Sequence, residues 1–79
     1  MKKKFRVIVR EIVVTETIGF SKVYDFPCLE RARVFFNAAI GDFLYNIDDL
    51  DDIYKRETDN TSQLDVFCRG FYRQFILYK

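Results

Sequence analysis

The first third of the chain alternates hydrophobic and polar residues, the pattern of β-strands that bury one face. In residues 4–17, one phenylalanine and two valines alternate with lysine and arginine as far as Glu11, although Ile8 interrupts the polar positions. There the alternation slips by one residue, so we expect a bulge or bend near Arg10 and Glu11 that keeps one face inward. A second alternating run covers residues 20–26. Together the two runs predict an antiparallel hairpin.

A helical pattern follows Pro27, which ends the second strand because proline has no N–H to donate to a sheet. From Leu29 to Ile47, hydrophobic residues recur every three or four positions and form one stripe. Gly41 costs about 1 kcal/mol relative to alanine inside a helix, so we expect it to mark close packing, a bend or the helix end. The run from Ile47 to Tyr54 keeps a helical spacing and predicts a continuation of the helix or a second short one.

Strand patterns return in the C-terminal part of the chain after a polar loop. Residues 64–69 alternate, and residues 71–78 are nearly all aromatic, aliphatic or arginine. Between them, Arg69–Gly70 fits a two-residue hairpin turn, which we favour, or a bulge in one long strand. We therefore predict one α+β domain over residues 1–79. It has an antiparallel sheet of three or four strands with one main amphipathic helix on one face, arranged ββαββ or ββαβ.

One helix covers only one face of a small sheet, so some hydrophobic side chains must point away from it. The supply is large, because 49% of the residues are hydrophobic and 18% are aromatic. On the uncovered face we expect Ile8, Val13, Val23 and either the set Phe67, Phe71, Phe75 and Leu77 or the set Tyr72, Ile76 and Tyr78. Exposed patches of this kind mark interaction sites. We expect the partner-binding surface around Phe71, Tyr72, Arg73 and Tyr78.

Acidic residues concentrate in one part of the chain, although the net charge is only +1 at pH 7. The densest run contains Asp48, Asp49, Asp51 and Asp52. A solvated face explains this run, and docking of a basic partner is the functional alternative, so the run is a secondary partner-binding candidate. It does not fit an EF-hand, because counting from Asp48 places Ile53 where the loop needs glycine.

A nucleic-acid-binding module is the alternative function. Basic residues lie near both ends of the chain, and neither the first ten nor the last eleven residues include an acid. Together with sheet aromatics, these cations would contact the phosphates and bases of a single strand. The residues concerned are Lys3, Lys4, Arg6, Arg10, Arg69 and Arg73. The near-zero net charge argues against a dedicated nucleic-acid binder, so this function ranks second.

The sequence lacks the residues of common catalytic centres and zinc sites. It contains no histidine and two cysteines, Cys28 and Cys68, which we expect to be buried thiols rather than a disulfide. Its three glycines stand apart, so no glycine-rich phosphate loop is present. We therefore expect no enzymatic activity, no metal and no cofactor.

The expected function is that of a small protein-interaction module that binds stoichiometrically, as an adaptor or an inhibitor. Self-association as a homodimer is the simplest way to cover the exposed sheet face. Charged residues interrupt the apolar positions near the N-terminus, so we expect no signal peptide, no membrane span and a cytoplasmic location. The size and the composition fit a gene of a phage or mobile element.

Overall fold

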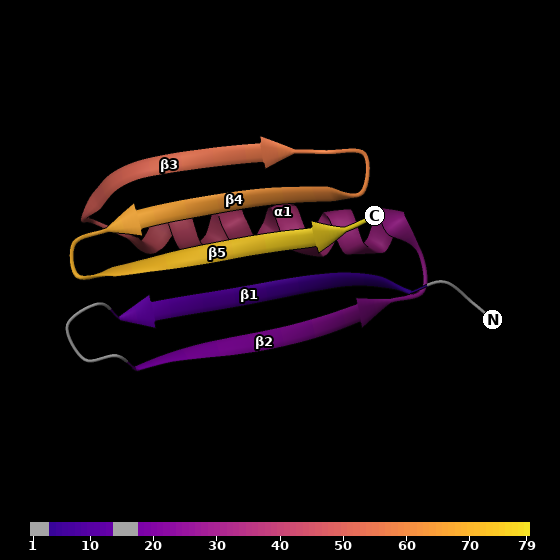
Figure 1. Cartoon of the computed structure of the whole chain (residues 1–79), viewed down its shortest axis with the longest axis horizontal. Helices are drawn as coiled ribbons and strands as arrows, with labels where there is room; N and C mark the ends of the chain where they lie inside the picture. The colour runs from indigo at the N-terminus through magenta and orange to yellow at the C-terminus, as the bar shows by residue number, and fades with distance from the viewer. Residues whose placement is uncertain (1–3, 14–17) are drawn as a thin grey trace.

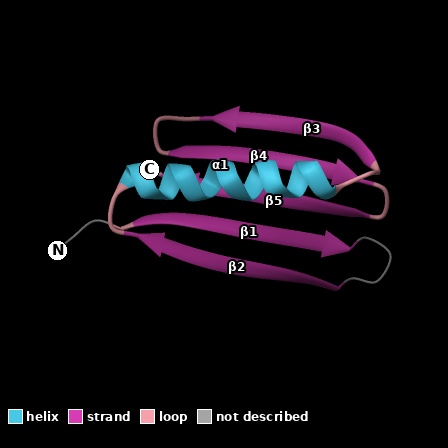
Figure 2. Cartoon of the chain, turned by 180° about the vertical axis from the view of Figure 1, so that it is seen from behind, coloured by secondary structure: helices cyan, strands magenta, loops and turns pink. Residues whose placement is uncertain are grey.

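A computed structural model of the chain describes residues 4–13 and 18–79 (Figure 1). The strands β1 (Phe5–Val13) and β2 (Ile18–Phe26) precede the helix α1 (Leu29–Asn46). The strands β3 (Leu50–Glu57), β4 (Thr61–Cys68) and β5 (Phe71–Tyr78) follow it. All five strands form one antiparallel sheet in the order β2-β1-β5-β4-β3, so β5 is central and β2 and β3 are the edges. The helix lies on one face of the sheet only (Figures 1 and 2).

The α+β class is confirmed, and the sheet has five strands where the sequence pattern predicts three or four. The additional strand is β3, which begins within the stretch from Ile47 to Tyr54 whose spacing predicts a helix. The helix ends at Asn46, and Ile47 is already extended, with φ −96° and ψ 143°. A register shift between Leu50 and Asp52 places Leu50 and Ile53 on the same face of the strand. This bulge reproduces the three-residue spacing of a helix, which is why the prediction was wrong.

The turn at Arg69–Gly70 joins β4 to β5 as a tight hairpin. Gly70 has φ 87°, a left-handed conformation that glycine adopts without strain. The Arg69 N–H donates to the carbonyl oxygen of Asp49 at 3.2 Å, which ties the turn to the chain leading into β3. The hairpin interpretation is thus confirmed, and the single long C-terminal strand is wrong.

The expected bulge near Arg10 and Glu11 is wrong as well. Strand β1 pairs with β2 and with β5 in an unbroken register through both residues. Glu11 therefore stays on the helix side of the sheet, and Ile12 points to the other side. The carboxylate is accommodated there because Arg73 donates to it from Nε at 3.0 Å and from Nη2 at 2.6 Å.

The hydrophobic core lies between α1 and the sheet (Figure 2). The helical stripe is confirmed, and the buried residues of α1 are Ala32, Phe36 and Phe43. They pack against side chains from three neighbouring strands, among which Val7, Val66, Phe75 and Leu77 are the most buried. Burying one such side chain stabilises the fold by about 1.5–3 kcal/mol.

Gly41 marks neither close packing nor the end of the helix. An alanine Cβ at this position would find no atom within 4 Å, so close packing does not require the glycine. The helix also continues past it to Asn46.

No helix in the described part of the chain is long and apolar enough to cross a membrane.

Candidate functional site

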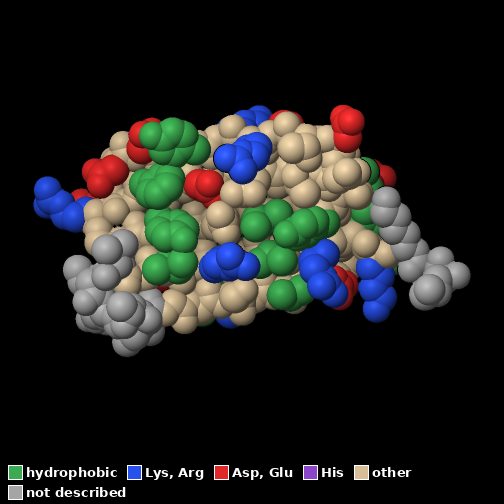
Figure 3. Space-filling view, viewed as in Figure 1, with side chains coloured by type: hydrophobic (Ala, Val, Ile, Leu, Met, Phe, Trp, Pro, Cys, Tyr) green, Lys and Arg blue, Asp and Glu red, His purple; other side chains and the backbone are tan. Residues whose placement is uncertain are grey.

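The face of the sheet that α1 leaves uncovered, called the open face below, is the candidate site (Figure 3). Because side chains alternate along a strand, the pairing registers define which residues share this face. Its rows across the sheet are Asp25, Arg6, Tyr78 and Thr61; Val23, Ile8, Ile76, Gln63 and Arg56; Ser21, Arg10, Gln74, Asp65 and Tyr54; and Gly19, Ile12, Tyr72, Phe67 and Asp52.

Four of these side chains form an aromatic stripe, defined as Ile12, Tyr72, Phe67 and Tyr54. They come from β1, β5, β4 and β3, which are neighbours in that order across the sheet. The Phe67 ring stacks on Tyr72, with centroids 5.6 Å apart, and meets Tyr54 edge-on at 5.5 Å. Tyr54 remains 59% exposed and Phe67 is also exposed. The stripe is therefore an ordered aromatic surface in contact with water.

A second group, the aliphatic stripe, consists of Val23, Ile8 and Ile76 with Tyr78 beside them. These residues lie on β2, β1 and β5. Figure 3 shows the hydrophobic side chains of this face gathered in two groups, with charged side chains between and around them. The registers place a polar row between the stripes, and its central members are Arg10, Gln74 and Asp65.

The expected partner-binding residues near the C-terminus divide between the two faces of the sheet. Tyr72 and Tyr78 lie on the open face. Phe71 lies on the helix side, where its ring meets Phe43 edge-on with centroids 6.3 Å apart. Arg73 also lies on the helix side, so neither it nor Phe71 belongs to the exposed patch in which the sequence placed them. Phe67 pairs with Tyr72 across the two-residue turn and therefore joins the open face.

Arg73 has a structural setting instead. Its guanidinium carbon lies 4.3 Å from the centroid of the Phe43 ring and 5.2 Å from that of Phe20. Its ion pair with Glu11 has side chains that are only 22% and 20% exposed. The cation thus links β5 to β1, β2 and α1, and a phosphate would have to compete with Glu11 for it.

The acidic run lies beside one end of the aromatic stripe. Asp48 and Asp49 are exposed in the connection between α1 and β3, and Asp51 lies at the bulge of that strand. Asp52 pairs with Phe67, and its carboxylate accepts the N–H of Ile53 at 2.8 Å. It also raises the pKa of Tyr54 by hydrogen bonding and by charge. Within the described residues, no group of three or more Cys, Asp or Glu is placed to hold a metal ion.

The expected nucleic-acid-binding cations do not form one patch. Arg6 is on the open face but donates to Asp25 at 2.8 Å. Arg10 shares that face and makes no ion pair with another described residue. Arg69, in the β4–β5 turn, and Lys4, before β1, lie at opposite ends of the sheet. Arg73 is on the other face, and Lys3 lies outside the described residues.

The two cysteines are both free thiols with different surroundings. Cys68 is buried on the helix side of β4, and burial is the main cause that raises its pKa. Cys28 is exposed immediately before α1, so the expectation of two buried thiols is correct only for Cys68.

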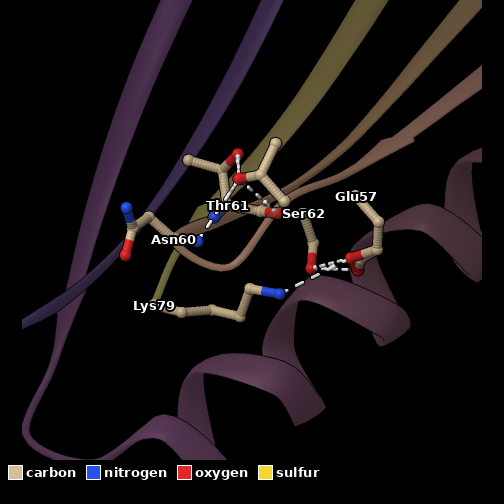
Figure 4. A network of polar contacts seen from close by, with 6 residues as sticks. Glu57, Asn60, Thr61, Ser62 and Lys79 are labelled. Carbon is tan, nitrogen blue, oxygen red and sulfur yellow. Dashed lines mark hydrogen bonds and ion pairs between the residues drawn. The ribbon is translucent and has the colours of Figure 1, made fainter.

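A shallow groove of about 350 Å³ lies on the helix side, between α1 and the β3–β4 hairpin. The helix leaves β3 uncovered, so all eight residues of that strand are exposed beside the groove. At one end, the Ser62 hydroxyl donates to Oε2 of Glu57 at 2.8 Å and Lys79 lies 3.6 Å from the same oxygen (Figure 4). The Ser62 hydrogen bond is the main cause that lowers the pKa of Glu57. The Glu57 carboxylate therefore already has its hydrogen-bond and ion-pair partners within the chain.

The sequence and the structure of the chain were also compared with those of known proteins. No protein-family model, curated protein or solved structure gave a significant match. What the protein does must therefore be inferred from the chemistry of its own surfaces, among them the ordered aromatic stripe of the open face.

Proposed function

We propose that the protein is a non-enzymatic interaction module that binds another protein surface, in a fixed ratio, through its open face. The observation that supports this proposal is the aromatic stripe, which runs across four strands with its rings packed on one another and open to water. Contiguous apolar surface of this kind is what protein interfaces bury, and tyrosine is enriched among the residues that dominate binding.

The two stripes and the polar row define the chemistry of the partner. It presents hydrophobic side chains opposite both stripes, an acid opposite Arg10 and a base opposite Asp65. Binding without chemistry makes the module an adaptor or an inhibitor, acting in the cytoplasm. The size and composition fit a gene that a phage or mobile element carries.

Capture from a lysate of the source organism tests this function with three tagged proteins. They are the wild type, Tyr72→Glu, which places a charge in the aromatic stripe, and the matched control Val34→Glu. Val34 is 65% exposed on α1, on the other side of the molecule, so the same change there leaves the open face intact. We expect a stoichiometric protein that resists nuclease and is retained by the wild type and the control. Equal capture by Tyr72→Glu would contradict the proposal, provided that circular dichroism shows it folded.

Single-stranded nucleic acid is a second candidate, which the stacked rings of Tyr72 and Phe67 favour. Sheet aromatics stack on bases in several single-strand-binding domains. Arg10 and Arg56 flank the rings on the same face, but Asp52 and Asp65 lie there as well. Binding of labelled oligonucleotides across a salt series separates the two functions. Affinity that falls steeply with salt and is lost in Arg10→Ala would support this candidate over a protein partner.

A further inference from the structure

We infer that the occupant of the open face is a second copy of this chain, packed face to face about a two-fold axis that runs close to β5. This inference rests on the proposed function and names its partner. The first support is the position of β5 at the centre of the five-stranded sheet. Rotation about an axis along the central strand places β1 over β4 of the second copy and β2 over its β3. Each residue keeps its height along the strands, so every row of the open face meets the same row of the second copy.

The polar row becomes complementary in charge under this rotation. Arg10 on β1 and Asp65 on β4 both pair with Gln74 of the central strand, so they lie at one height on its two sides. In the dimer, each Arg10 faces Asp65 of the second copy, and the contact occurs twice. Neither charge has an ion-pair partner among the described residues of its own chain.

The row that carries Ile12, Tyr72 and Phe67 matches as well. Ile12 on β1 and Phe67 on β4 both pair with Tyr72, so Ile12 of one copy faces Phe67 of the other. Three residues of the central strand, Tyr72, Ile76 and Tyr78, meet their own counterparts near the axis. Near the axis the aromatic row is thus covered by apolar side chains, as an isologous interface requires. In the aliphatic row, Ile76 meets its counterpart, whereas Ile8 faces Gln63 and Val23 faces Arg56 of the second copy toward the edge of the interface.

Other face-to-face arrangements are less favourable. An in-plane axis at right angles to the strands, placed on the polar row, sets Arg10 against Arg10 and Asp65 against Asp65. Moving that axis by half a row sets Arg10 against Ile8 or Ile12, which buries a charge without a partner. Aligned sheets cross at about 30°, which displaces β1 along β4 of the second copy by only about 2–3 Å. That offset is within the reach of an arginine side chain.

The size of the open face sets the strength of such a dimer. Five strands at about 4.8 Å and eight residues at about 3.3 Å give roughly 600 Å² per copy, or about 1,200 Å² in total. This value is at the lower limit for specific interfaces, so we expect a reversible dimer rather than an obligate one. Pairing through the edge strand β3 is disfavoured, because it carries the charges of Asp51, Asp52, Lys55, Arg56 and Glu57, which protect an edge.

A charge-swap experiment by sedimentation velocity, from about 1 to about 300 μM, tests the arrangement. The proteins are the wild type, Arg10→Asp, Asp65→Arg and the double variant, each checked for folding by circular dichroism. The wild type should dimerise, and each single variant should bind itself at least about 10-fold more weakly, since like charges then meet twice. The double variant, and a mixture of the two single variants, should recover the dimer, because opposite charges meet again in both.

Three outcomes would overturn this inference. One is a wild type that stays monomeric up to the highest concentration, and another is a dimer that none of the charge changes affects. The third is association that requires added oligonucleotide, which points to the nucleic-acid candidate. A monomeric protein that still captures a foreign protein in a Tyr72-dependent manner would refute the self-association and leave the proposed function standing.

Discussion

The ion pair between Arg73 and Glu11 allows a quantitative test of the helix-side packing. We consider Arg73→Met and Glu11→Gln, which remove the charges and keep most of the side-chain volume. Both side chains are about four-fifths buried, and the pair has hydrogen bonds of 2.6 and 3.0 Å. Removal of either charge leaves the other without its partner in a mostly dry site, at a cost of about 2–3 kcal/mol in the free energy of unfolding. In a domain of this size, that lowers the melting temperature by roughly 10–20 °C.

A double-mutant cycle isolates the interaction itself. Unfolding by urea, followed by circular dichroism, gives the free energy of unfolding for the wild type, both single variants and the double variant. We expect a coupling energy of about 2 kcal/mol, because the two single losses share the same interaction. A coupling below about 0.5 kcal/mol would refute the reasoning, since it would make this pair equivalent to a solvent-exposed one.

The pair of Arg6 and Asp25 is the matched control for this cycle. It joins neighbouring strands at 2.8 Å with the same chemistry, but on the open face, where the side chains are 53% and 33% exposed. We expect a smaller coupling there, measured at low protein concentration. If both cycles gave the same value, burial would not be what strengthens the Arg73 pair.

Two further predictions concern stability. Gly41→Ala should stabilise the protein by about 0.5–1 kcal/mol, because the site is helical and open. Gly19→Ala should instead destabilise it, because the added Cβ would collide with the carbonyl oxygen of Glu11. Opposite shifts in the urea midpoint would bear this out, and a loss in Gly41→Ala would count against it. Folding lowers the pKa of Glu57, so its contribution is present above the unfolded pKa and is lost as pH falls through the folded value. Stability should therefore decline below about pH 4.5, less steeply in Glu57→Gln, and parallel pH profiles would argue otherwise.

Local patterns were sufficient for the elements whose structure is set by near neighbours. The hairpin of β1 and β2 and the helix from Leu29 follow from alternation, from Pro27 and from a three-to-four spacing, and the structure confirms them. The two-residue turn at Arg69–Gly70 was identified for the same reason, since glycine there permits a positive φ.

The errors came from positions where strand pairing overrides the local pattern. In β3, a bulge gave Leu50 and Ile53 the spacing of a helix. At Glu11, a distant arginine compensates the carboxylate and removes the need for a bend. Two of the four residues of the aromatic stripe depend on these same positions, because Tyr54 lies on β3 and Ile12 follows Glu11. The sequence left two alternating sets of the last strand open, and the pairing of β5 with β1 is what places Tyr72 and Tyr78 on the open face.

The order of the strands also determines how this chain can fold during its synthesis. The central strand β5 is the last of the five along the chain, and it joins the β1–β2 hairpin to the β3–β4 hairpin. Until β5 leaves the ribosome, the nascent chain has two separate hairpins and a helix whose hydrophobic stripe lacks the strand that provides Phe75 and Leu77. Closure then depends on contacts between distant parts of the sequence, which form slowly. Until β5 is inserted, the chain therefore exposes apolar surfaces that the complete sheet buries, and exposed surface of this kind is prone to aggregation and is what chaperones bind.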